Sequence, residues 1–546
     1  MQYKPPSGSQ TPSVPADPRA ESPTLSRAIL SHALLLAVAG DALLRGASAG
    51  VAFPLWIGIL GIAMASATRR SGRDVSREAA GWLITAVLFS AGLAWRDSSI
   101  LQPLDVLATL GALAMAAIAL GNSRAALLAE RFRDTVWAAA ALARVIAAGF
   151  VPLAVRELFA TDARGRWTSR VRPVFRSTLI AGTLLVVFGS LLRGADPIFA
   201  SLVELPQLDA GLLVSHAFVI GGLCWLVSGW MSGALGPELR QRRAPESWPF
   251  GLSLLDITTA LGTLSLLFAA FVVVQLGWFF GGESFLRART GLTAAEYARR
   301  GFFEMVWVVM LVVPLLVATR AALRPGRALE RRHTLLSVPV IALLGAMILS
   351  AVTRMQLYVT YYGLTVDRFY PLVFMAWLSV VLVWLALTVL RGHGRAFIAG
   401  VAISGLVVLA ALNVVAPDAL IARFNIDRAA RVPRPAGSAL DLRHMANLSA
   451  EAATLATRAL LAASATAEGT RLGAADDAQR CYAALTLLRR WGPASQSAKR
   501  READGAWRYW NAGEARAIRV VRERSAELRT VQHTACPGVP RAERGK

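Results

Sequence analysis

The chain of 546 residues is 55% apolar and only 17% charged, whereas soluble globular domains carry about 25% charged residues. This composition and the positive mean hydropathy exclude an ordinary soluble protein. The net charge of +23 comes mostly from arginines in short loops between apolar runs, a placement typical of cytoplasmic loops that face anionic lipid headgroups. We therefore expect anionic membrane lipid, and no nucleic acid, as a partner of these basic loops.

Residues 1–26 are rich in proline and serine and predict a disordered leader, without the apolar core of a cleavable signal peptide. Apolar runs long enough to cross roughly 30 Å of hydrocarbon follow. They lie at 28–44, 51–67, 79–95, 104–121, 174–192, 210–235, 254–280, 301–320, 335–354, 370–390 and 396–415. The pattern predicts an all-α fold, a polytopic transmembrane helix bundle of about 11 spans.

The apolar segment 135–155 predicts a helix that lies at the membrane interface or re-enters the membrane without crossing it. Arg144 lies at its centre, and basic residues flank both of its ends. A crossing would place Arg144 at mid-membrane, at a cost of about 2.5–3.5 kcal/mol, and would put a basic loop outside. An interfacial helix avoids both penalties. The alternative is one further span.

With that segment at the interface, the arginine-rich loops fall on one side of the membrane, which the distribution of basic residues assigns to the cytoplasm. The N-terminus then lies in the cytoplasm and the C-terminal tail outside. We expect membrane segments with an interfacial helix at 27–173 and a core membrane domain at 174–416. A small helical extramembrane domain should occupy 417–530, with a frayed end at 531–546.

The cysteines and histidines are scattered without ligand spacing, so we expect no metal site and no cofactor. Cys481 and Cys536 can form a disulfide if the tail lies in an oxidising compartment. Free thiols are the alternative, and we favour it because Cys536 lies near an end that carries little helical pattern.

One pattern occurs twice between Gly277 and Trp384: an apolar run, a Gly-Leu-Thr turn at 291 or 363, and a second apolar run. The expected topology places the connections 193–197, 281–300 and 354–370 together on the outer side. Their polar side chains, together with Glu304 inside the span 301–320, are our candidate binding residues, while the catalytic residues stay unknown. The candidates are Arg354, Tyr358, Tyr362, Glu296, Arg300, Glu304, Asp196, Asp367 and Arg368.

Local spacing gives some of these residues simpler roles. Thr293 and Glu296 form a capping box, and Thr365 is expected to cap its helix alone. Arg354 and the tyrosines at 358, 361 and 362 share one helix face, which fits either a headgroup-binding cluster or an ordinary interfacial aromatic belt.

Two further spacings lie within the predicted spans. Glu304 can pair with Arg300 at i, i+4. Gly229 and Gly233 form a small-xxx-small motif, which predicts close helix packing.

Several ordered motifs resemble a family of bacterial polytopic membrane proteins known only as a domain of unknown function. They are Gly-Leu-Thr-x-x-Glu-Tyr-Ala-Arg-Arg-Gly-Phe-Phe-Glu (291–304), Arg-Met-x-Leu-Tyr (354–358), Tyr-Gly-Leu-Thr (362–365) and Val-Phe-Met-Ala-Trp (373–377). Ala-Asp-Pro (195–197), Ile-Ala-Arg-Phe-Asn (421–425), Leu-Asp-Leu (440–442) and Trp-Arg-Tyr-Trp-Asn (507–511) are similar to its pattern as well. The resemblance covers residues 175–511. It implies a multi-pass protein of the bacterial inner (plasma) membrane and assigns no catalytic residue.

Two functional interpretations remain. The first is a non-enzymatic membrane protein that handles a small molecule or lipid, or acts as an envelope or signalling component, through a polar site on its outer face. The second is a membrane-embedded transferase for a lipid-linked substrate, which needs a carboxylate beside a basic phosphate clamp. The sequence lacks a phosphate-binding loop, a dinucleotide fingerprint and a hydrolase nucleophile elbow, which argues against an ATP-driven pump or a standard hydrolase. No spacing signature supports the transferase, so we favour the first interpretation.

The expected sidedness has a direct test. Alkaline phosphatase fused after Asn425 should be active, because it folds only outside the cytoplasm, and a fluorescent reporter that folds only in the cytosol should stay dark at the same position. Bright fluorescence with an inactive phosphatase would contradict the assignment.

Overall fold

The computed structural model describes residues 23–46, 50–121, 132–148, 210–236, 253–290, 302–323, 326–391, 394–431, 440–464, 476–502 and 505–537, with five isolated positions between 177 and 188. The regular elements of these residues are helices. For residues 275–290 and 302–306 the description covers the backbone alone.

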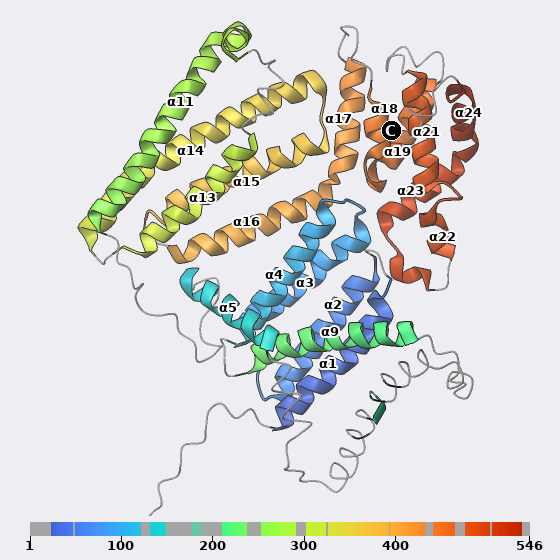
Figure 1. Cartoon of the computed structure of the whole chain (residues 1–546), viewed down its shortest axis with the longest axis horizontal. Helices are drawn as coiled ribbons and strands as arrows, with labels where there is room; N and C mark the ends of the chain where they lie inside the picture. Colours follow the sequence, from blue (N-terminus) through green and yellow to red (C-terminus); the bar gives the residue numbers. More distant parts are fainter. Residues whose placement is uncertain are drawn as a thin grey trace, which may run out of the picture.

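The N-terminal half consists of apolar helices. They are α1 (Pro23–Leu44), α2 (Ala52–Arg70), α3 (Arg77–Trp95), α4 (Leu101–Gly121), α5 (Phe132–Ala148) and α9 (Ala210–Leu235). Helices α1 to α4 run side by side and α9 lies across them (Figure 1). α9 packs on α1 and α4, and α5 packs on α9. Ile57, Met64 and Met231 are among the fully buried side chains that hold this half together.

Two glycines bring α9 against α5. A Cβ on Gly229 would lie 2.7 Å from the backbone of Ile146, and one on Gly233 would lie 2.5 Å from Leu142 Cδ1. Any larger residue at these positions would push the helices apart. The close packing predicted for the small-xxx-small motif is confirmed, with α5 as the partner helix.

In its described part, the second half of the bundle contains two longer helices and three of ordinary length. The longer helices are α11 (Leu254–Thr290) and α14 (Arg327–Tyr362), and the others are α13 (Phe302–Ala321), α15 (Val366–Thr388) and α16 (Gly394–Val415). Leu261, Leu344 and Leu385 are fully buried in its core. α16 also packs on α4 and α5, which joins the two halves.

The described residues contain nine helices that are long and apolar enough to cross a membrane: α1, α2, α3, α4, α9, α11, α14, α15 and α16. The all-α polytopic prediction is therefore confirmed. The apolar part of α13, Trp307–Arg320, is shorter, and the expected span at 174–192 lies almost wholly outside the described residues.

The segment expected at the interface begins as α5, whose apolar part is the short stretch Trp137–Ala148. Leu142 and Val145 are buried, whereas Arg144 is exposed. Residues 149–173 lie outside the described part of the chain, so the placement of this segment relative to the membrane stays a prediction.

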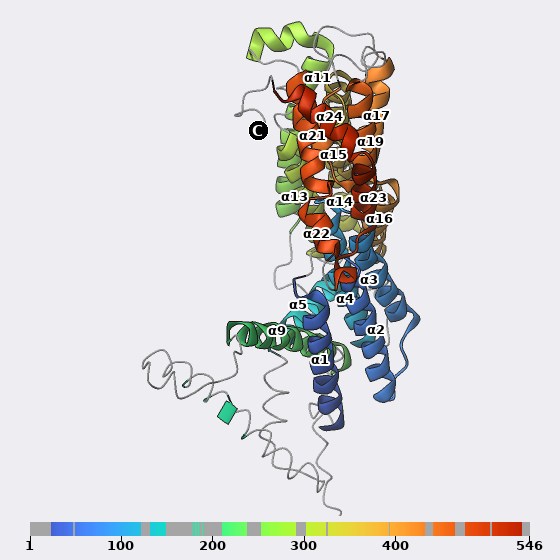
Figure 2. The ribbon, with the colours of Figure 1, turned by 90° about the vertical axis from the view of Figure 1, so that its right-hand side faces the viewer.

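After α16 the chain forms shorter helices that lie side by side along the right-hand edge of Figure 1 and face the viewer in Figure 2. They are α17 (Pro417–Arg431), α18 (Leu442–Asn447), α19 (Ala450–Ser464), α21 (Asp477–Trp491), α22 (Gln496–Glu502), η2 (Ala506–Tyr509), α23 (Ala512–Glu523) and α24 (Ser525–Ala535). Leu460, Leu487 and Val521 belong to a core that these helices share. We call residues 417–537 the tail layer.

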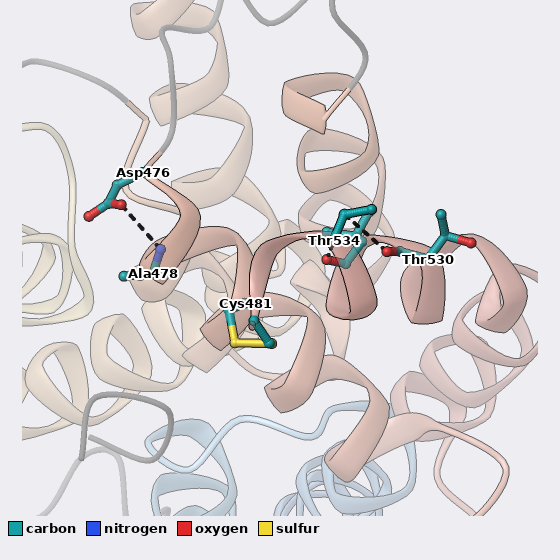
Figure 3. The surroundings of a disulfide bond; sticks show 7 residues. Asp476, Ala478, Cys481, Thr530 and Thr534 are labelled. Carbon is teal, nitrogen blue, oxygen red and sulfur yellow. Dashed lines mark hydrogen bonds between the residues drawn. A yellow bond between two sulfur atoms is a disulfide. The ribbon is translucent and has the colours of Figure 1, made fainter. Parts of the chain in front are cut away.

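A disulfide joins Cys481 of α21 to Cys536 directly after α24 (Figure 3). Their Cα atoms lie 4.9 Å apart, although the two cysteines are separated by 55 positions in the sequence. The preference for free thiols was wrong because α24 continues to Ala535 and holds Cys536 against α21. Among the described residues Cys224, buried in the N-terminal half, is the free cysteine.

The disulfide should stabilise the tail layer, because it restricts the conformations that the unfolded chain can adopt. Cys481→Ser should lower the free energy of unfolding of this layer by roughly 2–4 kcal/mol, measured by denaturant titration of the purified protein. Cys536→Ser should cost about the same, and the double variant no more than either alone, since all three lack the same bond. Additive losses would contradict the pairing.

Candidate functional site

The tail layer contacts one end of the helix bundle, which we call the docked end. The turns α1–α2, α3–α4 and α14–α15 lie there. At the first turn, the Val51 amide donates to the Trp510 carbonyl at 3.2 Å, and Arg508 Nη1 donates to the Ala42 carbonyl at 2.6 Å. Gly50 permits this approach, because a Cβ there would lie 2.6 Å from the Arg508 carbonyl oxygen.

Asn511 connects the second turn to the tail layer. Its Nδ2 donates to the carbonyls of Leu93 and Arg96, each at 2.8 Å, at the end of α3. Its Oδ1 accepts from the Glu514 amide at 3.1 Å and so caps α23. The residue is 1% exposed. One buried amide thus satisfies two carbonyls at the end of α3 and an amide in the first turn of α23.

The α3–α4 turn makes two further connections. Arg96 Nε donates to the Asn413 carbonyl at 2.6 Å, at the end of α16. The Asp97 amide donates to Glu451 Oε1 at 2.7 Å, in the first turn of α19. The turn is therefore held between the bundle and the tail layer.

The α14–α15 turn is clamped by Asn425 of α17. Asn425 Oδ1 accepts from the Leu364 amide at 2.9 Å, and its Nδ2 donates to the Leu364 carbonyl at 2.7 Å. Gly363 has a φ of 81°, a left-handed conformation that favours glycine. A Cβ at Gly363 would also lie 2.6 Å from Asn425 Oδ1, so the turn needs glycine for both reasons.

These contacts enclose a polar cavity of about 320 Å³ between the bundle and the tail layer, which we call the junction cavity. Its residues come from the α3–α4 turn, from the starts of α4, α15 and α17, and from α18 and α21. They are Asp97, Ser98, Ser99, Ile100, Gln102, Val366, Asp418, His444, Asn447, Leu448, Ser449 and Arg490.

The junction cavity contains two carboxylates. Burial, with the nearby charges of Glu514 and Glu451, raises the pKa of Asp97 to about 7. Asp418 is buried, and its Oδ2 accepts from the Ser449 amide at 3.0 Å. At neutral pH, Asp97 is therefore partly protonated, in a group of acids that repel one another.

Two basic residues face these acids. Burial lowers the pKa of Arg490 and of His444. Arg490 Nη1 donates to three carbonyls, those of Ala446, Asn447 and Leu448, so this nitrogen is occupied. His444 lines the cavity, and its Nε2 is buried and has no hydrogen-bond partner among the described residues.

An apolar groove of about 460 Å³ adjoins the junction cavity on the membrane side. α4, α15 and α16 line it, and Trp377, Gly405 and Leu412 are among its residues. Ile100 lines both spaces. The hydroxyls of Ser98 in the cavity and Tyr370 in the groove lie 3.3 Å apart, so the polar and apolar spaces meet at this point.

Several candidate residues from the sequence come together at the α14–α15 turn. The Arg368 guanidinium lies 4.1 Å from the ring centroid of Tyr358 and 6.0 Å from that of Tyr362. The two tyrosine rings are 4.9 Å apart. Arg354 is buried one turn earlier in α14, and Asp367 is exposed. The arginine stacked on these tyrosines is Arg368, from the next helix.

The expected cap at Thr365 is wrong in one respect. Thr365 occupies the N-cap position of α15, but its side chain makes no capping hydrogen bond. Arg368 Nη1 instead donates to the Gly363 carbonyl and closes the turn from the other side.

The remaining candidates cannot be placed in the site. Asp196, Glu296 and Arg300 lie outside the described residues, as does the capping box at 293–296. Glu304 belongs to α13, where only its backbone is described. Within the described part of the chain, no group of three or more metal-ligating side chains occurs.

Sequence reasoning missed the charged residues of the junction cavity: Asp97, Asp418, His444 and Arg490. They come from segments far apart in the chain, and none of them belongs to a recognised spacing. The available signals were the polar Asp-Ser-Ser turn at 97–99 and the polar stretch 441–449, each adjoining an apolar segment.

The raised pKa of Asp97 predicts a pH-dependent stability. The folded protein keeps this proton up to pH about 7, whereas the unfolded chain releases it near the ordinary pKa of 3.8. Between these two pH values the folded state binds more protons than the unfolded chain. The contribution of Asp97 to the free energy of unfolding therefore falls as pH rises from about 4 to 7 and then levels off. Asp97→Asn should remove this slope in thermal unfolding measured across pH.

Glu527→Gln, on the exposed face of α24, is the matched control and should keep the slope of the wild-type protein. If Asp97→Asn leaves the profile unchanged, the carboxyl of Asp97 is not held in this environment.

No curated protein and no solved structure matches the chain. A family described as a domain of unknown function, DUF4153, matches residues 83–459. The match begins in α3 and ends in α19, so it contains three of the four charged residues of the junction cavity, Asp97, Asp418 and His444. The chain, an all-α polytopic helix bundle in whose described part nine helices are long and apolar enough to cross a membrane, belongs to the DUF4153 family.

Proposed function

We propose that this integral membrane protein binds a small polar molecule or a lipid headgroup in the junction cavity, without converting it chemically. The observation that carries the proposal is the cavity itself. Membrane helices and the tail layer line it jointly, and it contains the buried Asp418, the partly buried Asp97 and Arg490, and the unpartnered His444 Nε2. Convergent polar groups in a concave site are typical of ligand binding.

The proposal places the protein in the bacterial inner membrane, with its N-terminus in the cytoplasm and the tail layer on the outer face. The positions of the basic loops support this sidedness. Arg73, in the α2–α3 loop, donates to the carbonyls of Leu120 and Leu235 at the ends of α4 and α9. Arg320 pairs with Glu330 between α13 and α14. These basic loops lie at the end of the bundle opposite the tail layer, as the positive-inside rule requires of a cytoplasmic end.

The disulfide of the tail layer supports the same orientation. Disulfides persist in oxidising compartments and are rare in the cytosol of most cells. Cys481 and Cys536 are the described cysteines in the tail layer and they are paired, whereas Cys224 within the bundle is free. On the outer face, the junction cavity would receive its ligand from the envelope side.

A transferase acting on a lipid-linked substrate is the second candidate. The observation in its favour is Asp97, whose pKa of about 7 suits a general acid or base at neutral pH. Arg490 and His444 lie in the same cavity. Binding ranks first because Arg490 Nη1 is occupied by three backbone carbonyls and the described residues show no metal-ligand cluster beside the carboxylates.

The proposed binding can be tested with a substitution that obstructs the cavity. Ser99 lines the cavity and is exposed, so Ser99→Trp should fill the space without loss of a buried contact. In cells that lack the protein, wild type should restore the distribution of its lipid or small-molecule ligand, and Ser99→Trp should reduce that restoration at least tenfold. Mass spectrometry of membrane and medium extracts supplies the measurement.

Thr530→Trp, on the exposed face of α24, is the matched control and should behave as wild type at equal abundance. If Ser99→Trp also behaves as wild type, the cavity is not the site. If Asp97→Asn or Asp418→Asn abolishes a covalent product while membrane insertion stays normal, the transferase replaces the binding proposal.

A further inference from the structure

The junction cavity and the apolar groove form one amphiphilic site. The cavity contains charged groups, the groove is almost entirely apolar, and Ile100 and the Ser98–Tyr370 hydroxyl pair lie at the boundary between them. The groove opens among α4, α15 and α16, within the apolar length of the bundle. A molecule that fills both spaces needs a polar head and a hydrocarbon chain.

The charges of the cavity select the head. Asp97 and Asp418 are the acids that line the cavity, and Arg490 is the charged base. His444 adds no charge, because burial lowers its pKa and favours the neutral form. Glu451 and Glu514 add negative charge beside Asp97. Arg96 lies close to Glu451. Among the residues that line the cavity, the acids Asp97 and Asp418 outnumber the charged base Arg490, and a ligand cation that donates hydrogen bonds would offset this excess.

The other side of the cavity suits an anionic group. His444 Nε2 offers a buried hydrogen-bonding position, and Arg490 supplies a positive charge. Arg368 adds a second positive charge close to His444. A head with an ammonium at one end and a phosphate at the other would match both sides.

We propose that the amphiphilic site binds an aminophospholipid, with its ammonium between Asp97 and Asp418, its phosphate toward His444 and Arg490, and one acyl chain in the groove beside Trp377 and Gly405. The inference rests on the proposed function and names the ligand class for the same cavity. Neutralising the buried acids would stabilise the docking of the tail layer, so lipid occupancy and docking reinforce each other.

The test uses the full-length protein purified in detergent and native mass spectrometry with three lipids of identical acyl chains. Phosphatidylethanolamine should bind at least tenfold more tightly than phosphatidylcholine, whose head cannot donate N–H bonds, or phosphatidylglycerol, which is anionic. Asp97→Asn and Asp418→Asn should each weaken phosphatidylethanolamine binding about tenfold and reduce the difference among the lipids. Glu527→Gln should leave it unchanged.

A second pair of variants tests the acyl chain. Gly405→Leu should fill the groove, where a Cβ has ordinary contacts with Trp377, and should weaken binding. Gly345→Leu fills a different apolar groove, between α14 and α15, where a Cβ meets no atom within 4 Å, and should have no effect. Phosphoethanolamine, the head without its chains, should compete at least a hundredfold more weakly than the lipid.

Equal retention of the three lipids in wild type and all variants would overturn the inference, because it would describe ordinary annular lipid. Equal competition by phosphoethanolamine would also overturn it, since the groove would then be unused. In either case, if Ser99→Trp still reduces the handling of another ligand, the proposed function stands and only the lipid inference fails. If Ser99→Trp has no effect either, the proposed function fails as well.

Discussion

The arrangement depends on the polar contacts that dock the tail layer on the bundle, with Asn511 at their centre. Its single side chain bonds two carbonyls at the end of α3 and the first turn of α23. At 1% exposure these groups have no water to replace a lost partner, and an unsatisfied buried group costs roughly 1–3 kcal/mol. The junction cavity exists because these contacts hold the α3–α4 turn against α17, α18 and α21.

The spans could be predicted because hydrocarbon thickness imposes an apolar run of nearly constant length, which is visible in local sequence. The helix ends could not. α14 runs from Arg327 to Tyr362 although its apolar run was placed at 335–354, because the last turns pack beside Asn425 and Leu364 instead of ending at the hydrocarbon boundary. The fate of Cys536 likewise depended on α24 packing against α21.

The candidate site was predicted only at its edge. Tyr358, Tyr362 and Arg368 lie together because they are close in the chain and share one turn. The docked end joins residues such as Asp97 and Glu451, which are 354 positions apart, and no local spacing predicts such a contact. The motifs quoted from the sequence did carry a signal. Asn425, within the matched family region, and Arg508 and Asn511, beyond it, each make a docking contact, and Gly363 leaves room for Asn425.

The central claim is that the turns of the docked end and the tail layer meet on one side of the membrane. The double variant Val51→Cys with Trp510→Cys tests this claim by forming a disulfide between the two positions. The Val51 amide donates a hydrogen bond to the Trp510 carbonyl, so the two residues lie within reach of such a bond. With a protease site inserted between residues 237 and 250, the cleaved halves should stay joined without reductant. With Ser71→Cys and Trp510→Cys instead, the cleaved halves should separate. The account is contradicted if the halves stay joined in this second variant, or if they separate in the variant with cysteines at 51 and 510.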